Sequence, residues 1–168
     1  NNEDYWDEIP SLQFFALADG MGGHRAGEVA SKEAIHALMD ILNKTIGDSV
    51  ETLDLSEMHG IIQYAIEYAN QTIYKMGTKD TLLRGMGTTL CCLLFNPQGL
   101  VYAHVGDSRI YRLREGKLDQ LTKDDSLLRQ LRDAGQVRSG SSDGSSYKGI
   151  ITKAIGTEKT VDPSVHIT

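Results

Sequence analysis

The segment with the clearest chemical potential is Ala18-Asp19-Gly20-Met21-Gly22-Gly23, which follows an apolar run and precedes a helical pattern. A carboxylate at the end of a buried strand is costly unless it bonds its own turn or binds a cation. The glycines around it let backbone amides and carbonyls approach a ligand closely. Asp19 is therefore the first candidate for chemistry, and the segment alone favours a cation ligand and an Asx-type turn equally.

Two further acidic turns carry residue types that suit hard cations. Asn2-Glu3-Asp4 stands at the start of the chain, and Gly106-Asp107-Ser108 separates two β-type runs. Mg²⁺ and Mn²⁺ are held by a few carboxylates, backbone carbonyls and waters. Taken singly, a Gly-Asp-Ser step is most often a hydrogen-bonded turn, and an acidic terminus is most often solvated. The residues of the three turns alone therefore leave both a metal site and ordinary turns open.

The elements that must position these residues begin with one strand and two helices. Residues 14–18 form an apolar run of strand length, and apolar residues then recur at helical spacing from near Ala26 to Gly47. Asp54 and Glu57 have capping-box spacing at the start of a second helical pattern, and Gly77 predicts its end. We expect these two long helices to pack together on one face.

The second half of the chain has a β-type pattern. Short apolar runs occupy residues 88–95, 100–105, 109–113 and 118–121. Because a parallel pair needs a crossover of a dozen or so residues, the short connections between these runs predict antiparallel neighbours. We therefore expect a β-meander.

A less regular segment follows the meander. Residues 126–134 predict a short helix ended by Gly135, and residues 138–146 are so rich in Ser and Gly that we expect a mobile loop. Residues 150–155 restore a strand pattern, which Gly156 ends.

Composition restricts the class of protein. The chain has 168 residues, 40% of them hydrophobic and 24% charged, which predicts one globular domain over residues 1–168. Its formal charge of −6 argues against general binding to nucleic acid or to anionic membranes. No segment has the length of a membrane span or the pattern of a signal peptide, so a cytoplasmic location is expected. Cys91 and Cys92 are adjacent in an apolar run and are interpreted as reduced, buried residues.

Other polar residues favour structural roles. His104 lies in a strand pattern and is interpreted as a hydrogen-bonded core residue, and Arg109 and Arg112 as ion-pair residues. Ser108 and Ser126 have no matching base nearby, which argues against a Ser-His-Asp hydrolase.

The joint pattern resembles the metal-dependent serine/threonine protein phosphatases of type 2C (the PPM family), particularly the bacterial branch. The resemblance spans nearly the whole chain. It rests on Asn2-Glu3-Asp4, Ala18-Asp19-Gly20-Met21-Gly22-Gly23-His24 with Ala26-Gly27-Glu28, Gly87-Thr88-Thr89, His104-Val105-Gly106-Asp107-Ser108-Arg109-Ile110-Tyr111, Gln120-Leu121-Thr122-Lys123-Asp124, and Ile151-Thr152-Lys153-Ala154-Ile155-Gly156.

The resemblance implies an α+β fold in which helices flank a sandwich of two antiparallel sheets, an α-β-β-α arrangement with a two-metal site at one end. It implies that Asp19 bridges two Mn²⁺ or Mg²⁺ ions, that the Gly20 carbonyl contacts one of them, and that Glu3 and Asp4 bind metals directly or through water. Asp107 matches a residue of a third, weaker site. The expected reaction is hydrolysis of phosphoserine or phosphothreonine on proteins by a bridging, metal-bound hydroxide. The substrates expected are those of serine/threonine kinases.

Several departures from the family pattern shape these expectations. A phosphate-binding Arg would lie before Asn1, and two further metal-binding Asp residues and closing strands would follow the segment that ends at Gly156. We therefore expect a catalytic domain truncated at both ends, with residues 135–149 as a variable flap. The alternative function is a non-catalytic pseudophosphatase or truncated phosphoprotein-binding module. Met21 stands where some relatives place a general-acid His, and His24 is a less favoured substitute.

Overall fold

Strand β2 (Phe14–Met21) lies inside the larger sheet, and its burial alternates along the strand. Phe14, Ala16 and Ala18 are buried in the core, whereas Phe15, Leu17 and Asp19 lie on the opposite, more exposed face. This period of two follows from the pleat, which directs successive side chains to opposite faces. The computed structural model describes residues 2–140 and 142–168.

The larger sheet is antiparallel and has the strand order β1-β2-β4-β5-β8, with β3 paired to β2 beyond the start of β4. Its strands other than β2 are β1 (Asp4–Ile9), β3 (Gly87–Thr88), β4 (Leu90–Asn96), β5 (Gly99–Val105) and β8 (Ser164–Ile167). The sequence patterns predicted β2, β4 and β5 but not the edge strands β1 and β8. Both edge strands are short and have few fully buried residues, so their periodicity is weak.

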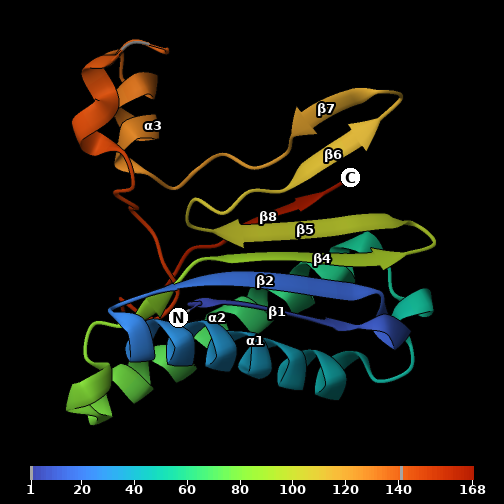
Figure 1. Cartoon of the computed structure of the whole chain (residues 1–168). Helices are drawn as coiled ribbons and strands as arrows, with labels where there is room; N and C mark the ends of the chain where they lie inside the picture. Colours follow the sequence, from blue (N-terminus) through green and yellow to red (C-terminus); the bar gives the residue numbers. More distant parts are fainter. Residues whose placement is uncertain (1, 141) are drawn as a thin grey trace.

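Helices α1 (His24–Ile46) and α2 (Leu55–Lys79) pack against each other and cover one face of the larger sheet (Figure 1). The predicted capping box is confirmed, because Asp54 and Glu57 exchange side-chain and backbone hydrogen bonds. The predicted end at Gly77 is wrong, since α2 continues to Lys79. Short 3-10 helices connect these elements: η1 (Pro10–Leu12), η2 (Val50–Thr52) and η3 (Thr81–Leu83).

Strands β6 (Tyr111–Arg114) and β7 (Lys117–Gln120) form a second, two-stranded sheet on the other side of the larger one (Figure 1). The expectation of one continuous meander is therefore wrong between β5 and β6. Asp125 explains the change of direction, because its backbone N–H donates to the Gly106 carbonyl and its carboxylate accepts from the Gly106 N–H, each at 3.0 Å. These bonds satisfy the backbone N–H and carbonyl of Gly106, so the turn after β5 needs no neighbouring strand as a hydrogen-bond partner.

Helix α3 (Leu127–Asp133) confirms the predicted short helix, with Ser126 as its N-cap. The prediction of an unpacked loop over residues 138–146 is only partly correct. A 3-10 helix, η4 (Ser142–Tyr147), occupies half of that segment, while Ser141 lies outside the described residues. A Cβ added at the buried Gly144 would meet the Leu128 side chain, so this turn packs closely against α3.

The predicted strand over residues 150–155 is also wrong. Ile151 and Ile155 make isolated antiparallel bridges to Ser126 and Thr88 respectively. The backbone between them bends, so the two bridges lie on different elements and do not form a ladder.

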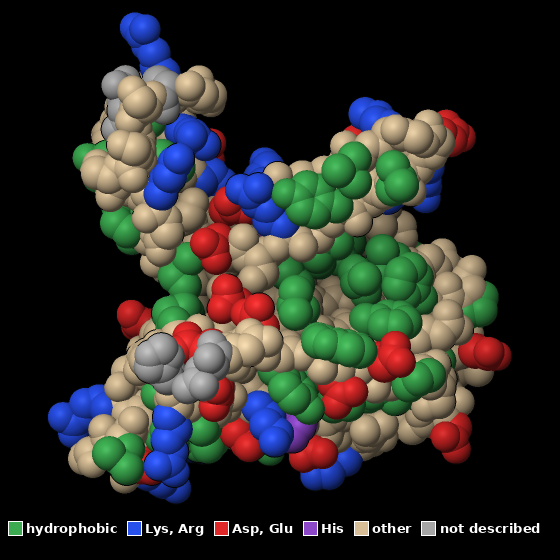
Figure 2. Space-filling model, in the orientation of Figure 1, with side chains coloured by type: hydrophobic (Ala, Val, Ile, Leu, Met, Phe, Trp, Pro, Cys, Tyr) green, Lys and Arg blue, Asp and Glu red, His purple; other side chains and the backbone are tan. Residues whose placement is uncertain are grey.

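The two sheets and their helices confirm the predicted α+β sandwich. Between the sheets, apolar side chains surround a hollow of about 290 Å³ (Figure 2). Trp6, Phe15 and Leu17 line it from the larger sheet and Tyr111 from the smaller one; all four are exposed. No helix within the described part of the chain combines the length and apolarity needed to cross a bilayer.

Candidate metal centre

Two carboxylates face each other at one end of the larger sheet. Asp4 on β1 is the register partner of Asp19 on β2. On the side of β2 away from Asp4, the Asp19 N–H donates to the Thr89 hydroxyl at 3.1 Å, and the Asp19 carbonyl accepts from the Thr89 N–H at 2.9 Å. Asp4 and Asp19 are therefore a pair without mutual backbone hydrogen bonds, the kind in which facing side chains lie closest.

The proximity of these carboxylates changes the acidity of Asp19. Partial desolvation, a hydrogen bond with the Asp4 side chain and the negative charges of Asp4, Asp107 and Glu3 together raise the pKa of Asp19 to about 6. Like charges disfavour the ionised form of a carboxyl, and a nearby cation would favour it. The crowding of negative charge therefore favours binding of a proton or a cation at Asp19.

Close backbone packing brings Glu3 to the same place. The Gly20 N–H donates to the Glu3 carbonyl at 3.0 Å. A Cβ added at Gly27, in the first turn of α1, would lie 2.8 Å from Glu3 Oε2, and one added at Gly20 would lie 2.0 Å from the Gly27 carbonyl oxygen. Gly20 in β2 and Gly27 in α1 therefore let the start of α1, the end of β2 and Glu3 approach each other.

Asp107 enters the site from the turn after β5. Gly106 in this turn has φ +100°, and an added Cβ would lie 2.8 Å from the Thr89 methyl group, so the position requires glycine. Ser108 Oγ lies 2.6 Å from Thr89 Oγ1, which links the turn to the strand region beside Asp19. The negative charge of Asp107 contributes to the raised pKa of Asp19.

The sequence-predicted residues Glu3, Asp4, Asp19, Gly20 and Asp107 thus gather around the end of β2. Within residues 2–140 and 142–168, however, no three side chains of His, Cys, Asp or Glu are close enough to enclose a cation by themselves. The donor set of carboxylates and backbone carbonyls nevertheless fits hard divalent cations. Metal coordination by these five residues stays a prediction.

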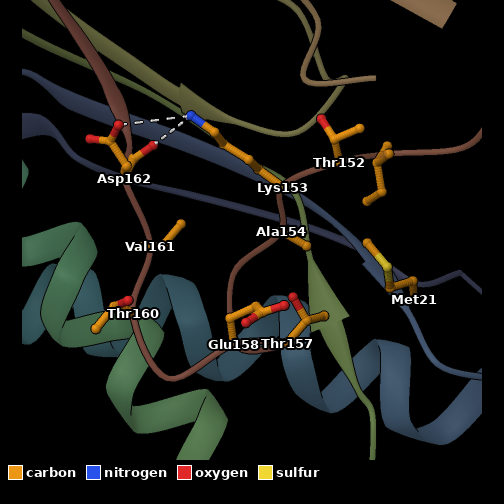
Figure 3. Close-up of a pocket in the computed structure, with 10 residues that line it drawn as sticks. Met21, Thr152, Lys153, Ala154, Thr157, Glu158, Thr160, Val161 and Asp162 are labelled. Carbon is orange, nitrogen blue, oxygen red and sulfur yellow. Dashed lines mark hydrogen bonds and ion pairs between the residues drawn. The ribbon is translucent and has the colours of Figure 1, made fainter. Parts of the chain in front are cut away.

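A groove of about 510 Å³ begins at Met21, two residues beyond Asp19 (Figure 3). Its other wall is the segment of residues 151–162, which contributes Thr152, Lys153 and Asp162. Lys153 reaches across to Asp162, with Nζ 3.2 Å from the Asp162 carbonyl oxygen and 4.0 Å from its carboxylate. The groove is open and has both apolar and polar side chains in its lining, and Met21 connects it along β2 to Asp19.

Asn70 on α2 fixes the segment that forms this wall. Its Oδ1 accepts from the Gly156 N–H at 2.7 Å, and its Nδ2 donates to the carbonyls of Glu158 and Lys159 at 3.1 and 3.3 Å. Asn70 is 1% exposed, so these bonds form away from water. Gly156 has φ +90° and lies against Ile73, which leaves no room for a side chain. A buried amide therefore shapes the groove.

Several other expectations are confirmed as structural roles. His104 is buried, with Nε2 2.7 Å from the Lys123 carbonyl oxygen. Arg109 pairs with Asp124 at 2.7 Å, and this pairing raises the pKa of Arg109. Cys91 and Cys92 are free and buried, and burial raises the pKa of the Cys91 thiol to about 12, so this thiol is neutral near pH 7.

Three residues near the site were missed by sequence reasoning. Thr89 lies in the Gly87-Thr88-Thr89 motif, but the sequence predicts no role for it, and it does not predict that Ser108 or Asp125 takes part in the site. Only the register of β2 against residues 87–96 reveals that Thr89 stands opposite Asp19. No local signal in the sequence marks Asp125 as the partner of Gly106.

Comparison with known proteins identifies the family. The family model described as Protein phosphatase 2C matches residues 1–133. The chain is 37% identical over 166 residues to protein phosphatase PhpP of Streptococcus pneumoniae, covering 97% of this chain and 65% of that protein. Its fold is similar to the crystal structure of the serine/threonine phosphatase Stp1 from Staphylococcus aureus, with a TM-score of 0.86 and 32% identity over 99% of this chain and 65% of that one.

A third similarity concerns metals. The catalytic domain of the serine/threonine protein phosphatase PstP, in complex with two manganese ions, matches with a TM-score of 0.79 and 34% identity over 100% of this chain and 66% of that one. The chain thus spans about 65% of the length of these three relatives. The match to the family model and the shared fold show that this chain belongs to the protein phosphatase 2C family.

Proposed function

We propose that this chain is the part of a bacterial serine/threonine protein phosphatase that carries its Asp4 and Asp19 metal ligands. The observation that carries the proposal is the facing pair Asp4 and Asp19, in which partial desolvation, the hydrogen bond with Asp4 and the surrounding negative charges raise the pKa of Asp19 to about 6. The expected substrates are proteins phosphorylated on serine or threonine by kinases, and the expected location is the cytoplasm. The names of the relatives and the two manganese ions bound to PstP support this function.

The proposed role of these residues is to bind divalent cations. Asp19, Asp4, Glu3, Asp107 and the Gly20 carbonyl would hold two Mn²⁺ or Mg²⁺ ions, with Asp107 facing a third and weaker position. When bound, these ions supply the chemistry that acidifies a water molecule and neutralises the phosphoryl oxygens. The fixed backbone around Asp19 keeps the carboxylates in place, so that the site does not reorganise when substrate arrives.

The groove at Met21 is our proposed place for the polypeptide around the phosphorylated residue. It adjoins the carboxylate cluster, and its wall is held by Asn70 rather than by a flexible loop. Helix α3 stands above this end of the molecule (Figure 1), and residues 135–149, which follow it in the sequence, remain the candidate flap. Met21 has no titratable group, so protonation of the leaving alkoxide requires another proton donor.

A second candidate function is binding of phosphoproteins without turnover. It is favoured by one observation, the absence of a complete group of three ligand side chains among the described residues. A phosphothreonine peptide and Mn²⁺ distinguish the two candidates. Phosphate release that a chelator abolishes supports the phosphatase, whereas peptide binding by fluorescence anisotropy with no phosphate release supports the binding module.

A further inference from the structure

The hydrogen-bond ladder between β2 and the neighbouring strand region breaks at one residue. The pairings of β2 with β4 and with β3 have one common register, in which Thr89 stands opposite Asp19. In a regular ladder the Asp19 N–H would donate to the Thr89 carbonyl. Instead it donates to the Thr89 hydroxyl at 3.1 Å, while the Thr89 carbonyl accepts from the Thr88 hydroxyl at 2.9 Å.

Thr89 therefore holds Asp19 at two points. Its Oγ1 accepts from the Asp19 N–H, and its own N–H donates to the Asp19 carbonyl at 2.9 Å. Thr89 is 3% exposed, so water cannot readily replace either bond. The backbone of Asp19 is fixed from the side opposite to Asp4, and its carboxylate remains on the face that Asp4 shares.

The same hydroxyl also reaches the turn that carries Asp107. Ser108 Oγ lies 2.6 Å from Thr89 Oγ1, and the Thr89 methyl group lies against Gly106. One hydroxyl can accept two hydrogen bonds and donate one, so Thr89 can bond Asp19 and Ser108 together. A single side chain thus connects two carboxylate-bearing segments that lie far apart in the sequence.

We propose that Thr89 is a positioning residue, which sets the backbone of Asp19 and the Asp107 turn at the separation that a divalent cation requires. The part of this inference that concerns the cation rests on the proposed function. Ser108 transmits the position of Thr89 to the turn. Removing the Thr89 hydroxyl would leave the Asp19 N–H without an acceptor and release the turn, while the fold would keep the other bonds of the ladder.

Thr89→Val tests this proposal, with Thr89→Ser as the conservative variant and Thr122→Val as the matched control. Thr122 is 2% exposed, and its hydroxyl accepts the Ile110 N–H at 3.1 Å, so the same atoms are lost at a site that does not touch Asp19. Exchange of the Asp19 amide is measured by NMR without metal, and Mn²⁺ affinity by calorimetry.

We expect Asp19 amide exchange to accelerate, and Mn²⁺ binding to weaken, by about tenfold each in Thr89→Val, which is the factor for one lost hydrogen bond of about 1.4 kcal/mol. Thr89→Ser should restore both, and Ser108→Ala should weaken Mn²⁺ binding less than Thr89→Val does. Unchanged exchange and affinity in Thr89→Val, or equal losses in Thr122→Val, would overturn the proposal. If the wild-type chain binds no Mn²⁺ but shows the expected exchange pattern, the metal-dependent function fails while the hold of Thr89 on Asp19 is upheld.

Discussion

Asp4 and Asp19 lie opposite each other across β1 and β2, and the carboxyl of each is within hydrogen-bonding reach of the other. Such a pair is unfavourable when both groups are ionised, because two negative charges share a partly desolvated space. A proton or a divalent cation removes the conflict, so the two compete for the site.

This competition predicts how cation binding depends on pH. Because the pKa of Asp19 is raised to about 6, most Asp19 carboxyls are ionised at pH 7 and most are protonated at pH 5. Mn²⁺ affinity should therefore fall by about tenfold between pH 7 and pH 5. Calorimetric titrations at several pH values measure this, and a pH-independent affinity above pH 5 would contradict it.

The free energy of unfolding of the metal-free protein should vary in the same pH range. The folded protein takes up a proton on Asp19 near pH 6, whereas an unfolded Asp does so near pH 3.8. The folded state therefore binds more protons between these values, and its stability should fall as pH rises from about 4 to about 6. Thermal melts of the wild type and of Asp19→Asn measure this effect, which the variant should lack. Parallel melting profiles for the two proteins would show that Asp19 does not titrate there.

Removal of the Asn70 side chain should destabilise the protein, because this side chain holds the groove wall. Asn70→Ala loses three hydrogen bonds to residues 156–159 and leaves a buried N–H without an acceptor. We expect a loss of about 2 to 4 kcal/mol in the free energy of unfolding, measured in urea. Asn43→Ala is the control, because Asn43 is exposed on α1 and its side chain should contribute less than about 0.5 kcal/mol. Equal effects of the two changes would show that Asn70 does not hold the wall.

Gly20 should not tolerate even the smallest side chain. Gly20→Ala places a Cβ 2.0 Å from the Gly27 carbonyl oxygen, so the start of α1 must move away from β2. We expect a destabilisation of about 3 kcal/mol and loss of Mn²⁺ binding. Gly60→Ala, in open space on α2, should instead stabilise the protein by about 1 kcal/mol. Chemical denaturation measures both, and a Gly20→Ala protein as stable as the wild type would refute the close packing.

Local signals in the sequence predicted the parts of the site that depend on local structure. The strand that carries Asp19 near its end, the glycine turn after it and the Asp54 capping box follow from short-range chemistry. The pairing of Asp19 with Asp4 and Thr89 depends on strand register, which brings together residues 15 and 70 positions apart and has no local mark. The chain leaves the larger sheet after Gly106, where Gly106 bonds to Asp125, and this contact between distant residues also has no local mark in the sequence. Tertiary hydrogen bonds of this kind decided the features that the sequence patterns missed.

The most direct test of the proposed phosphatase is phosphate release from a phosphothreonine peptide with Mn²⁺, compared among the wild type, Asp19→Asn and Asp40→Asn. Asp40 is an exposed carboxylate on α1 and serves as the control for lost charge. We predict chelator-sensitive release by the wild type and by Asp40→Asn, and a loss of at least about 100-fold in Asp19→Asn. Release that persists in Asp19→Asn, or that a chelator leaves unchanged, would contradict the assignment of Asp19 as the central metal ligand.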